Sequence, residues 1–325
     1  MRCVVTGALG FVGLNLVRRL AARGLDVIAV GRREPDEWVT RFLRDERQRV
    51  AFRVADLAVP GALQSALDTE QLDVLIHAAV ITATTGQVER DASLAIVATN
   101  VGGTMEALDV ARRHGVSRFV YVSSPSAIGN VAPDMALDEN VETHPTTIYG
   151  ITKRASEQLT RRYGEIHGLS TVSARIAQPY GPGERATPSR ARTSPIQEWL
   201  VAASSGERLI TGPVDVSRDW THIDDTARGI ELLATAPVLR HDLYHVNRAE
   251  LVSVGEIVAL LRAAFPDLTT DERDDAPGLN PNIAGPARRR PLDNSRFVAE
   301  LGWAPDTGID QGMGRYLGWW RSWRY

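Results

Sequence analysis

Lysine is almost absent from this chain. The 325 residues include 37 lysines and arginines, and Lys153 is the only lysine among them. The formal net charge is only −3, so we expect neither nucleic acid nor a membrane surface as a partner. The single cysteine, Cys3, excludes a disulfide within the chain. No apolar run approaches the length of a membrane span, and Arg2 leads directly into a predicted strand without a signal peptide, so we expect a soluble cytoplasmic protein.

The lysine follows a tyrosine by four residues, in the segment Tyr149-Gly-Ile-Thr-Lys153. At this spacing on a helix, the two side chains share a face. A nearby ammonium favours tyrosinate, so we expect Lys153 to lower the pKa of the phenol from about 10 toward neutral pH. A phenol tuned in this way can exchange a proton with a reacting hydroxyl or carbonyl. Taken alone, the spacing is more typical of a surface lysine beside a packed tyrosine.

The first thirty residues follow a strand, turn, helix, strand pattern. Residues 2–6 and 26–30 predict buried strands, and residues 11–23 predict a helix. Three glycines with the spacing GxxGxxG connect the first strand to the helix, where such a unit places a pyrophosphate on the helix N-terminus. We therefore expect this loop to bind a dinucleotide through Gly7, Leu9, Gly10, Phe11, Val12 and Gly13.

Two arginines, Arg32 and Arg33, follow the second strand. An acidic residue at this place would bind the adenosine ribose 2′-hydroxyl, whereas paired arginines suit a 2′-phosphate. The sequence therefore predicts NADP(H) as the cofactor, with NAD(H) as the alternative. In a chain so rich in arginine, an ordinary solvated basic loop is the competing interpretation.

Strands and helices alternate through about residue 175. Further strands are expected near 50–54, 73–77, 118–122 and 171–176, and further helices near 61–68, 91–114 and 149–167. This alternation predicts an α/β fold with a doubly wound parallel Rossmann sheet and a smaller C-terminal substrate lobe. We expect the Rossmann domain to comprise 1–173 and 214–247, and the lobe 174–213 and 248–325. Long loops are expected at 181–195 and 271–291, where lids and binding loops are common.

A serine pair follows the strand expected at 118–122. Ligands bind at the carboxyl ends of the strands in a parallel sheet, so the Ser124 hydroxyl is placed to hydrogen-bond the substrate oxygen that Tyr149 protonates. Alone, Ser-Ser-Pro is more typical of a turn.

These motifs together resemble the extended short-chain dehydrogenase/reductase family, which contains NAD(P)-dependent sugar epimerases, dehydratases and reductases. The resemblance runs nearly end to end, and Ser124, Tyr149 and Lys153 fall at the positions of the catalytic triad of the family. The other matching segments are 6–13 (TGxxGxxG in the family), 77–79 (a cofactor motif), 100–104 (NxxGT), 175–183 (RxxNVYGPG), 218–225 (RDFxHVDD) and 301–305 (LGWxP).

The resemblance implies roles for further residues. Lys153 would also hold the nicotinamide ribose, and Asn100 would support the lysine through a water. Further cofactor contacts would come from Asp56, Leu57, His77, Ala78, Ala79, Gln178 and Pro179. Substrate contacts would come from Ser124, Ser126, Gln178 and Arg218. We expect no metal ion. The family also implies a homodimer in which the helices at 91–114 and 149–167 pair across a two-fold axis.

Departures from the family pattern narrow the expected chemistry. Sugar-nucleotide dehydratases carry an Asp-Glu pair directly after the catalytic serine or threonine, but this chain has Pro125 and Ser126, so elimination of water has no evident acid and base. The leading hypothesis is an NADP(H)-dependent ketoreductase or dehydrogenase acting on a sugar, with a nucleotide-linked sugar favoured. The alternative is a sugar-nucleotide 4-epimerase similar to UDP-glucose 4-epimerase, with retained NAD(P). A third hypothesis is an NADP-sensing regulator, which would have no use for a tuned phenol.

Overall fold

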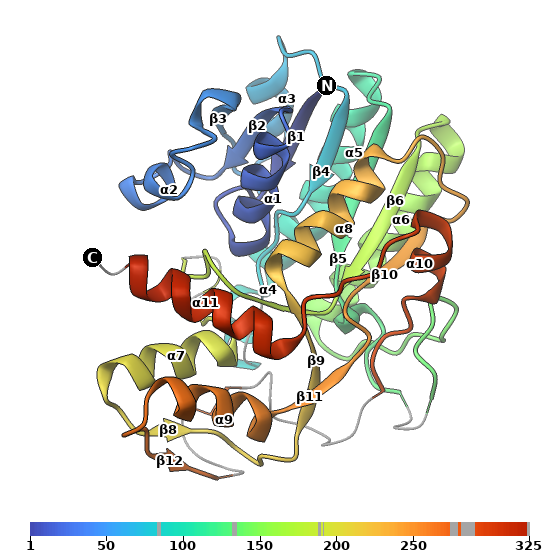
Figure 1. Cartoon of the computed structure of the whole chain (residues 1–325). Coiled ribbons are helices and arrows are strands. Elements are labelled where there is room, and N and C mark those ends of the chain that lie inside the picture. Colours follow the sequence, from blue (N-terminus) through green and yellow to red (C-terminus); the bar gives the residue numbers. More distant parts are fainter. Residues whose placement is uncertain are drawn as a thin grey trace.

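A seven-stranded parallel sheet forms the centre of the molecule (Figure 1). The computed structural model describes residues 1–82, 86–131, 135–187, 190, 192–273, 279–280 and 290–323. The strand order is β10-β6-β5-β4-β1-β2-β3. Their bounds are β1 Arg2–Thr6, β2 Asp26–Gly31, β3 Val50–Val54, β4 Val74–His77, β5 Arg118–Ser123, β6 Thr171–Ile176 and β10 Leu243–Val246. The expected Rossmann-like α/β fold is confirmed.

Helices cover both faces of this sheet, which is why its central strands are almost wholly apolar. On one face, Leu14 of α1 and Ile230 of α8 pack over Val5 and Ile76. On the other face, Leu63 of α3 and Leu108 of α5 pack over Val4 and Leu75, the alternate residues of the same strands. The bounds of these and the neighbouring helix are α1 Phe11–Ala22, α3 Ala62–Leu67, α5 Gly103–Arg113, α6 Ile148–His167 and α8 Ile223–Thr235.

The helix expected over 91–114 is interrupted. Helix α4 spans Gly86–Val97, a π-helical turn spans Ala98–Gly102, and α5 follows. At the interruption, a Cβ on Gly103 would lie 2.9 Å from Leu57 Cβ, so the chain approaches the segment after β3 closely. A π-helical turn inside a helix is frequent at functional sites.

A short helix after β2 was not expected. Helix α2 spans Glu37–Phe42, and the Asp36 carboxylate caps it by accepting a 3.0 Å hydrogen bond from Val39 N. Single 3₁₀ turns span Arg47–Arg49 and Pro125–Ala127.

A second group of elements lies beyond the carboxyl ends of the large sheet (Figure 1). Strand β9 pairs in parallel with β7 and antiparallel with β11. Residues Ile196, Leu200, Ile257, Leu261 and Met313 form a separate apolar core there. The elements are β7 Gln178–Tyr180, α7 Pro195–Ser205, β8 Leu209–Ile210, β9 Ser217–His222, β11 Leu251–Ser253, α9 Val254–Ala264, β12 Thr270–Asp271 and α11 Ile309–Trp323. Helix α10, Ser295–Leu301, packs beside β10.

Of the two long loops expected from the sequence, the first was expected over 181–195. It ends where helix α7 begins at Pro195, and Ser194 caps that helix. Most of the second, 271–291, lies outside the described residues.

The C-terminal helix joins the two groups of elements through aromatic contacts. Trp323 of α11 meets Trp38 edge-on at 5.4 Å between ring centroids, and Phe42 at 5.8 Å. Trp38 and Phe42 belong to α2, directly after the strand whose end carries Arg32 and Arg33. Within the part of the chain that the structure describes, no helix is both long and apolar enough to cross a membrane.

Candidate active site

A cavity of about 1090 Å³ opens where the large sheet meets the second group of elements. Its walls include the glycine loop, the ends of β2, β4 and β5, the start of α6, and β7 and β9. In open parallel sheets, ligands bind outside the carboxyl ends of the strands. Of the residues predicted for the site, the walls contain Gly7, Leu9, Gly10, Phe11, Val12, Gly13, Arg32, Arg33, Asp56, Leu57, Ala78, Ala79, Ser124, Ser126, Tyr149, Lys153, Gln178, Pro179 and Arg218.

The glycine loop has the shape that a pyrophosphate needs. Gly7 has φ +67°, and a Cβ there would lie 2.6 Å from the backbone of Ala79. A Cβ on Gly13 would lie 2.2 Å from Gly7 O, so the helix starts close under the turn. Gly10 precedes α1 and offers no side chain to cap it. The helix N-terminus therefore presents a positive end to the cavity, and these residues fit a dinucleotide.

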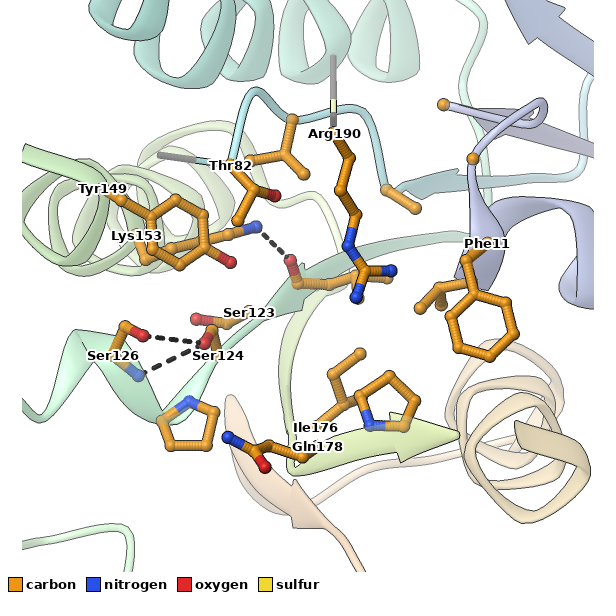
Figure 2. Close-up of a pocket in the computed structure, with 18 of the residues that line it drawn as sticks. Phe11, Thr82, Ser123, Ser124, Ser126, Tyr149, Lys153, Ile176, Gln178 and Arg190 are labelled. Carbon is orange, nitrogen blue, oxygen red and sulfur yellow. Dashed lines mark hydrogen bonds between the residues drawn. The ribbon is translucent and has the colours of Figure 1, made fainter. Parts of the chain in front are cut away.

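Lys153 is buried beneath the cavity and donates a 2.7 Å hydrogen bond from Nζ to Val122 O at the end of β5. Its ammonium also lies 4.8 Å from the centroid of the Tyr121 ring and 5.8 Å from that of Tyr149. Burial lowers the pKa of Lys153 to about 7, although the Glu157 carboxylate opposes this shift. Tyr149 and Lys153 share one face of α6, as their spacing predicts (Figure 2).

The expectation that the Tyr149 phenol has a lowered pKa is wrong. Burial raises the pKa of Tyr149, while hydrogen bonding with Ser124 and the charge of Arg190 lower it only in part. Burial, which the spacing cannot reveal, decides this result.

Ser124 begins the 3₁₀ turn after β5. Its hydroxyl accepts a hydrogen bond from Ser126 N at 3.2 Å and lies 3.3 Å from Ser126 Oγ (Figure 2). Ser124 and Tyr149 both line the cavity, and hydrogen bonding with Ser124 lowers the pKa of Tyr149 in part. A substrate oxygen could therefore meet both groups.

A buried ion pair supports this corner from behind. Arg175 donates from Nε and Nη2 to the two carboxylate oxygens of Glu157, at 2.7 and 2.8 Å. Glu157 follows Lys153 by one helical turn, and its Oε1 also accepts from Ser123 Oγ at 2.6 Å. The pair thus fixes the end of β5, β6 and α6 relative to one another. The sequence reasoning did not identify it, although Glu157 stands at i+4 from the lysine.

Two predicted residues, Asn100 and His77, lie behind the cavity wall. Asn100 exchanges hydrogen bonds with the backbone of Ile81 at 2.8 and 3.1 Å and donates to Thr152 Oγ1 at 3.1 Å. His77 is fully buried between the hydroxyls of Thr6 and Thr104, and burial lowers its pKa to about 3. Neither side chain is part of the cavity wall formed by the described residues. Their geometry suits the support of neighbouring backbone.

One end of the cavity is bounded by Gln178 and Pro179 of β7 and by Arg218 of β9. Asp219 lies beside Arg218, and burial raises the pKa of its carboxyl to about 6 in spite of a hydrogen bond from Asn247. This end therefore combines a permanent cation with a carboxyl that titrates near neutral pH.

Arg190 reaches into the middle of the cavity, between Lys153 and Phe11 (Figure 2). Its guanidinium pairs with the buried carboxylate of Glu184 at 2.8 Å and lies 5.9 Å from the centroid of the Phe11 ring. Glu184 also accepts from the backbone and hydroxyl of Ser194, at 2.7 and 2.6 Å. The sequence reasoning missed Arg190 because it lies in a segment without periodicity, in a chain with many arginines.

Comparison with known protein families identifies the family of this chain. Residues 3–247 match the model of the NAD dependent epimerase/dehydratase family. The chain belongs to that family. The matched segment covers the large sheet from β1 to β10, the glycine loop and the Ser124, Tyr149 and Lys153 corner. The resemblance drawn from the motifs is thereby confirmed, and the family is one of enzymes.

Curated members of the family align with nearly all of this chain. A dTDP-glucose 4,6-dehydratase of Streptomyces griseus is 29% identical, over 98% of this chain and 95% of its own length. A UDP-glucose 4-epimerase of Mycolicibacterium smegmatis is 26% identical, over 99% of both. A dTDP-4-dehydro-6-deoxy-D-allose reductase of Streptomyces bikiniensis is 28% identical, over 95% and 94%. Among solved structures, MoeE5 in complex with UDP-glucose and NAD superposes with a TM-score of 0.81 at 25% identity, covering all of both chains.

Proposed function

We propose that this chain is an NADP(H)-dependent reductase or dehydrogenase that acts on a secondary alcohol or ketone of a nucleotide-linked sugar. One observation carries the proposal: Ser124, Tyr149 and Lys153 line the same cavity as the glycine loop. The 28% identical relative that is named a keto-sugar reductase supports the reaction class, and the complex of MoeE5 with UDP-glucose supports the substrate class.

The proposal gives each of the catalytic residues a role. A bound nicotinamide would exchange hydride with the substrate carbon. The Tyr149 hydroxyl gives a proton to the substrate oxygen, or takes one from it, and Ser124 hydrogen-bonds the same oxygen. Lys153 holds the nicotinamide ribose and supplies positive charge beside the phenol. Asn100 fixes Thr152, the residue before the lysine.

The remaining cofactor contacts follow the cavity wall. The glycine loop would hold the pyrophosphate, and Asp56 and Leu57 would contact the adenine. Arg32 and Arg33 would bind a 2′-phosphate, which supports NADP(H) over the NAD bound by MoeE5. Both arginines border the cavity, and the Arg33 side chain is 49% exposed.

Elimination of water is not part of the proposal. Pro125 and Ser126 follow Ser124, so no carboxylate stands directly after the catalytic serine as an acid or base. Among the described residues that line the cavity, the acidic ones are Asp56, at the adenosine end, and Asp219, on β9.

The second candidate is a sugar-nucleotide 4-epimerase, favoured by the 26% identical epimerase that aligns with 99% of this chain. It would use the same residues and retain its cofactor. The absorbance spectrum of dialysed protein, followed by incubation with nucleotide keto-sugars and NADPH and, separately, with nucleotide sugars that carry a free 4-hydroxyl, separates the two. A reductase consumes NADPH in proportion to sugar reduced. A reduced-nicotinamide band that survives dialysis, together with interconversion of sugars and no net NADPH consumption, would refute the reductase and support the epimerase.

We also propose a homodimer formed by α4 and α6. These helices pack side by side and expose apolar side chains: Leu94 is 85% exposed, Val97 46%, Ile151 49% and Ile166 54%. Large apolar side chains gathered on neighbouring helices are typical of an interface.

The division into a Rossmann domain (1–173 and 214–247) and a substrate lobe (174–213 and 248–325) is likewise proposed. Two observations support it in part: α8 and β10 pack with the large sheet, and α7, α9 and α11 share the separate apolar core. Within 214–247, β9 pairs with strands of the second group. A cytoplasmic location, where a soluble nucleotide cofactor pool is available, completes the proposal.

A further inference from the structure

Arg185 connects the second group of elements to the adenosine end of the cavity. It lies between β7 and α7, yet its Nη1 donates a 2.9 Å hydrogen bond to Asp36 Oδ2, after β2. The same carboxylate oxygen lies 3.5 Å from Arg33 Nη2. Two guanidiniums from distant parts of the chain are therefore held together by one carboxylate.

The guanidinium of Arg185 has donors to spare. Its Nε and Nη2 are buried and have no hydrogen-bond partner among the described residues. Its Cζ lies 4.5 Å from the centroid of the Trp38 ring, so the aromatic face fixes the orientation of the guanidinium plane. Buried donors without acceptors are costly, so the guanidinium would gain hydrogen bonds by turning toward an acceptor that a ligand brings into the cavity it borders.

The local charge favours an anion. Arg32, Arg33 and Arg185 all border the cavity, and Asp36 is the carboxylate that bridges the last two. Asp36 remains committed to the start of α2 through its bond from Val39 N. Three permanent cations, set against the carboxylates of Asp36 and of Asp56 on the same end of the cavity wall, leave a net positive site, which suits a phosphate dianion.

We propose that Arg185 is the third arginine of the 2′-phosphate site. The second group of elements would then contribute directly to the discrimination between NADPH and NADH. This inference rests on the proposed preference for NADP(H). It assigns a cofactor contact to the segment after β7, which the sequence analysis placed in the substrate lobe. Binding of the 2′-phosphate would then hold that segment against α2.

Calorimetric titration of the whole protein with NADPH and with NADH tests the inference. In Arg185→Gln, we expect NADPH affinity to fall by about tenfold or more while NADH affinity changes by less than about threefold, because only NADPH carries the phosphate. Arg185→Lys keeps the charge but loses the planar fork, so an intermediate loss is expected. The matched control is Arg192→Gln, in the same segment, whose guanidinium pairs with Glu198 at 2.8 and 3.2 Å and which is not among the described cavity residues.

Each other outcome is decisive. If the natural chain prefers NADPH and Arg185→Gln retains that preference in full, the role of Arg185 is refuted while Arg32 and Arg33 remain the phosphate ligands. Equal losses for both cofactors would show that Arg185 supports only the fold of this region. If the natural chain binds NADH as tightly as NADPH, the proposed cofactor preference fails and the inference fails with it. Circular dichroism and the melting temperature of each variant separate a local effect from misfolding.

Discussion

The Nζ atom of Lys153 donates a 2.7 Å hydrogen bond to the carbonyl oxygen of Val122. This contact anchors the only lysine of the chain near the end of β5. Val122 comes one residue before Ser123, the last residue of β5, and two residues before Ser124. The ammonium beside the phenol is therefore positioned by the same strand that leads into Ser124. Because burial lowers the pKa of this lysine to about 7, its charge is sensitive to pH near neutrality.

A pH profile should report this sensitivity. Lys153 carries its charge below its pKa and loses it as pH rises, so kcat/KM for NADPH, which reflects the free enzyme, should fall above pH about 7. Steady-state rates at limiting NADPH across neutral and alkaline pH provide the measurement. A flat profile to about pH 9 would mean that the buried lysine keeps its proton or that its charge does not matter.

The cofactor preference depends on Arg32 and Arg33. A charge-assisted bidentate contact with phosphate is worth about 1.5–3 kcal/mol, so the natural chain should bind NADPH more than about tenfold tighter than NADH. The double variant Arg32→Asp, Arg33→Ala should lose or reverse this preference in calorimetry. Arg44, paired on the surface with Asp45, offers a control for the loss of a cation. Equal or tighter NADH binding by the natural chain would contradict the assignment.

The proposed dimer can be broken at Leu94. An aspartate at this exposed position would place a charge in the apolar interface that α4 and α6 are proposed to form with the partner protomer. Light scattering at micromolar concentration should therefore show a monomer for Leu94→Asp and a dimer for the natural chain. Val238→Asp is the control, because Val238 is 73% exposed but lies outside those helices. A natural chain that is already monomeric under these conditions would refute the dimer.

The ion pair behind the site should matter for stability. Glu157→Gln leaves Arg175 buried with an uncompensated charge, and the loss in the free energy of unfolding should be about 3–5 kcal/mol. Urea unfolding gives the comparison. Glu165→Gln, on the same helix but in an exposed pair with Arg162, should change stability by less than about 1 kcal/mol. A similar small effect at both positions would show that the buried pair contributes no more than a surface pair.

The sequence predicted much of this architecture because the signals were local. Apolar runs located the strands, and the glycine spacing located the turn over α1. The missing parts depend on contacts between distant segments. The packing of Gly103 against Leu57 accompanies the break before α5, and the carbonyl of Val122 determines where the charge of Lys153 is held.

The candidate site divides in the same way. Motif residues such as Tyr149 and Ser124 lie on the cavity, as their places at strand and helix ends predict. His77 belongs to a motif too, but both of its ring nitrogens are engaged by threonines inside the sheet. Arg185 and Arg190 border the cavity from a segment without periodicity, so only the folded chain reveals them.

The central claim is that Tyr149 transfers the proton and that Lys153 makes this possible. Lys153→Arg is the most direct test, because it preserves a positive charge while replacing a compact ammonium with a wide planar group. Turnover of a nucleotide keto-sugar with NADPH, measured beside Tyr149→Phe and with folding checked by circular dichroism, should fall by about 10²–10⁴-fold in both variants. If Lys153→Arg keeps more than about a tenth of natural turnover, the account of catalysis built on these two residues is contradicted.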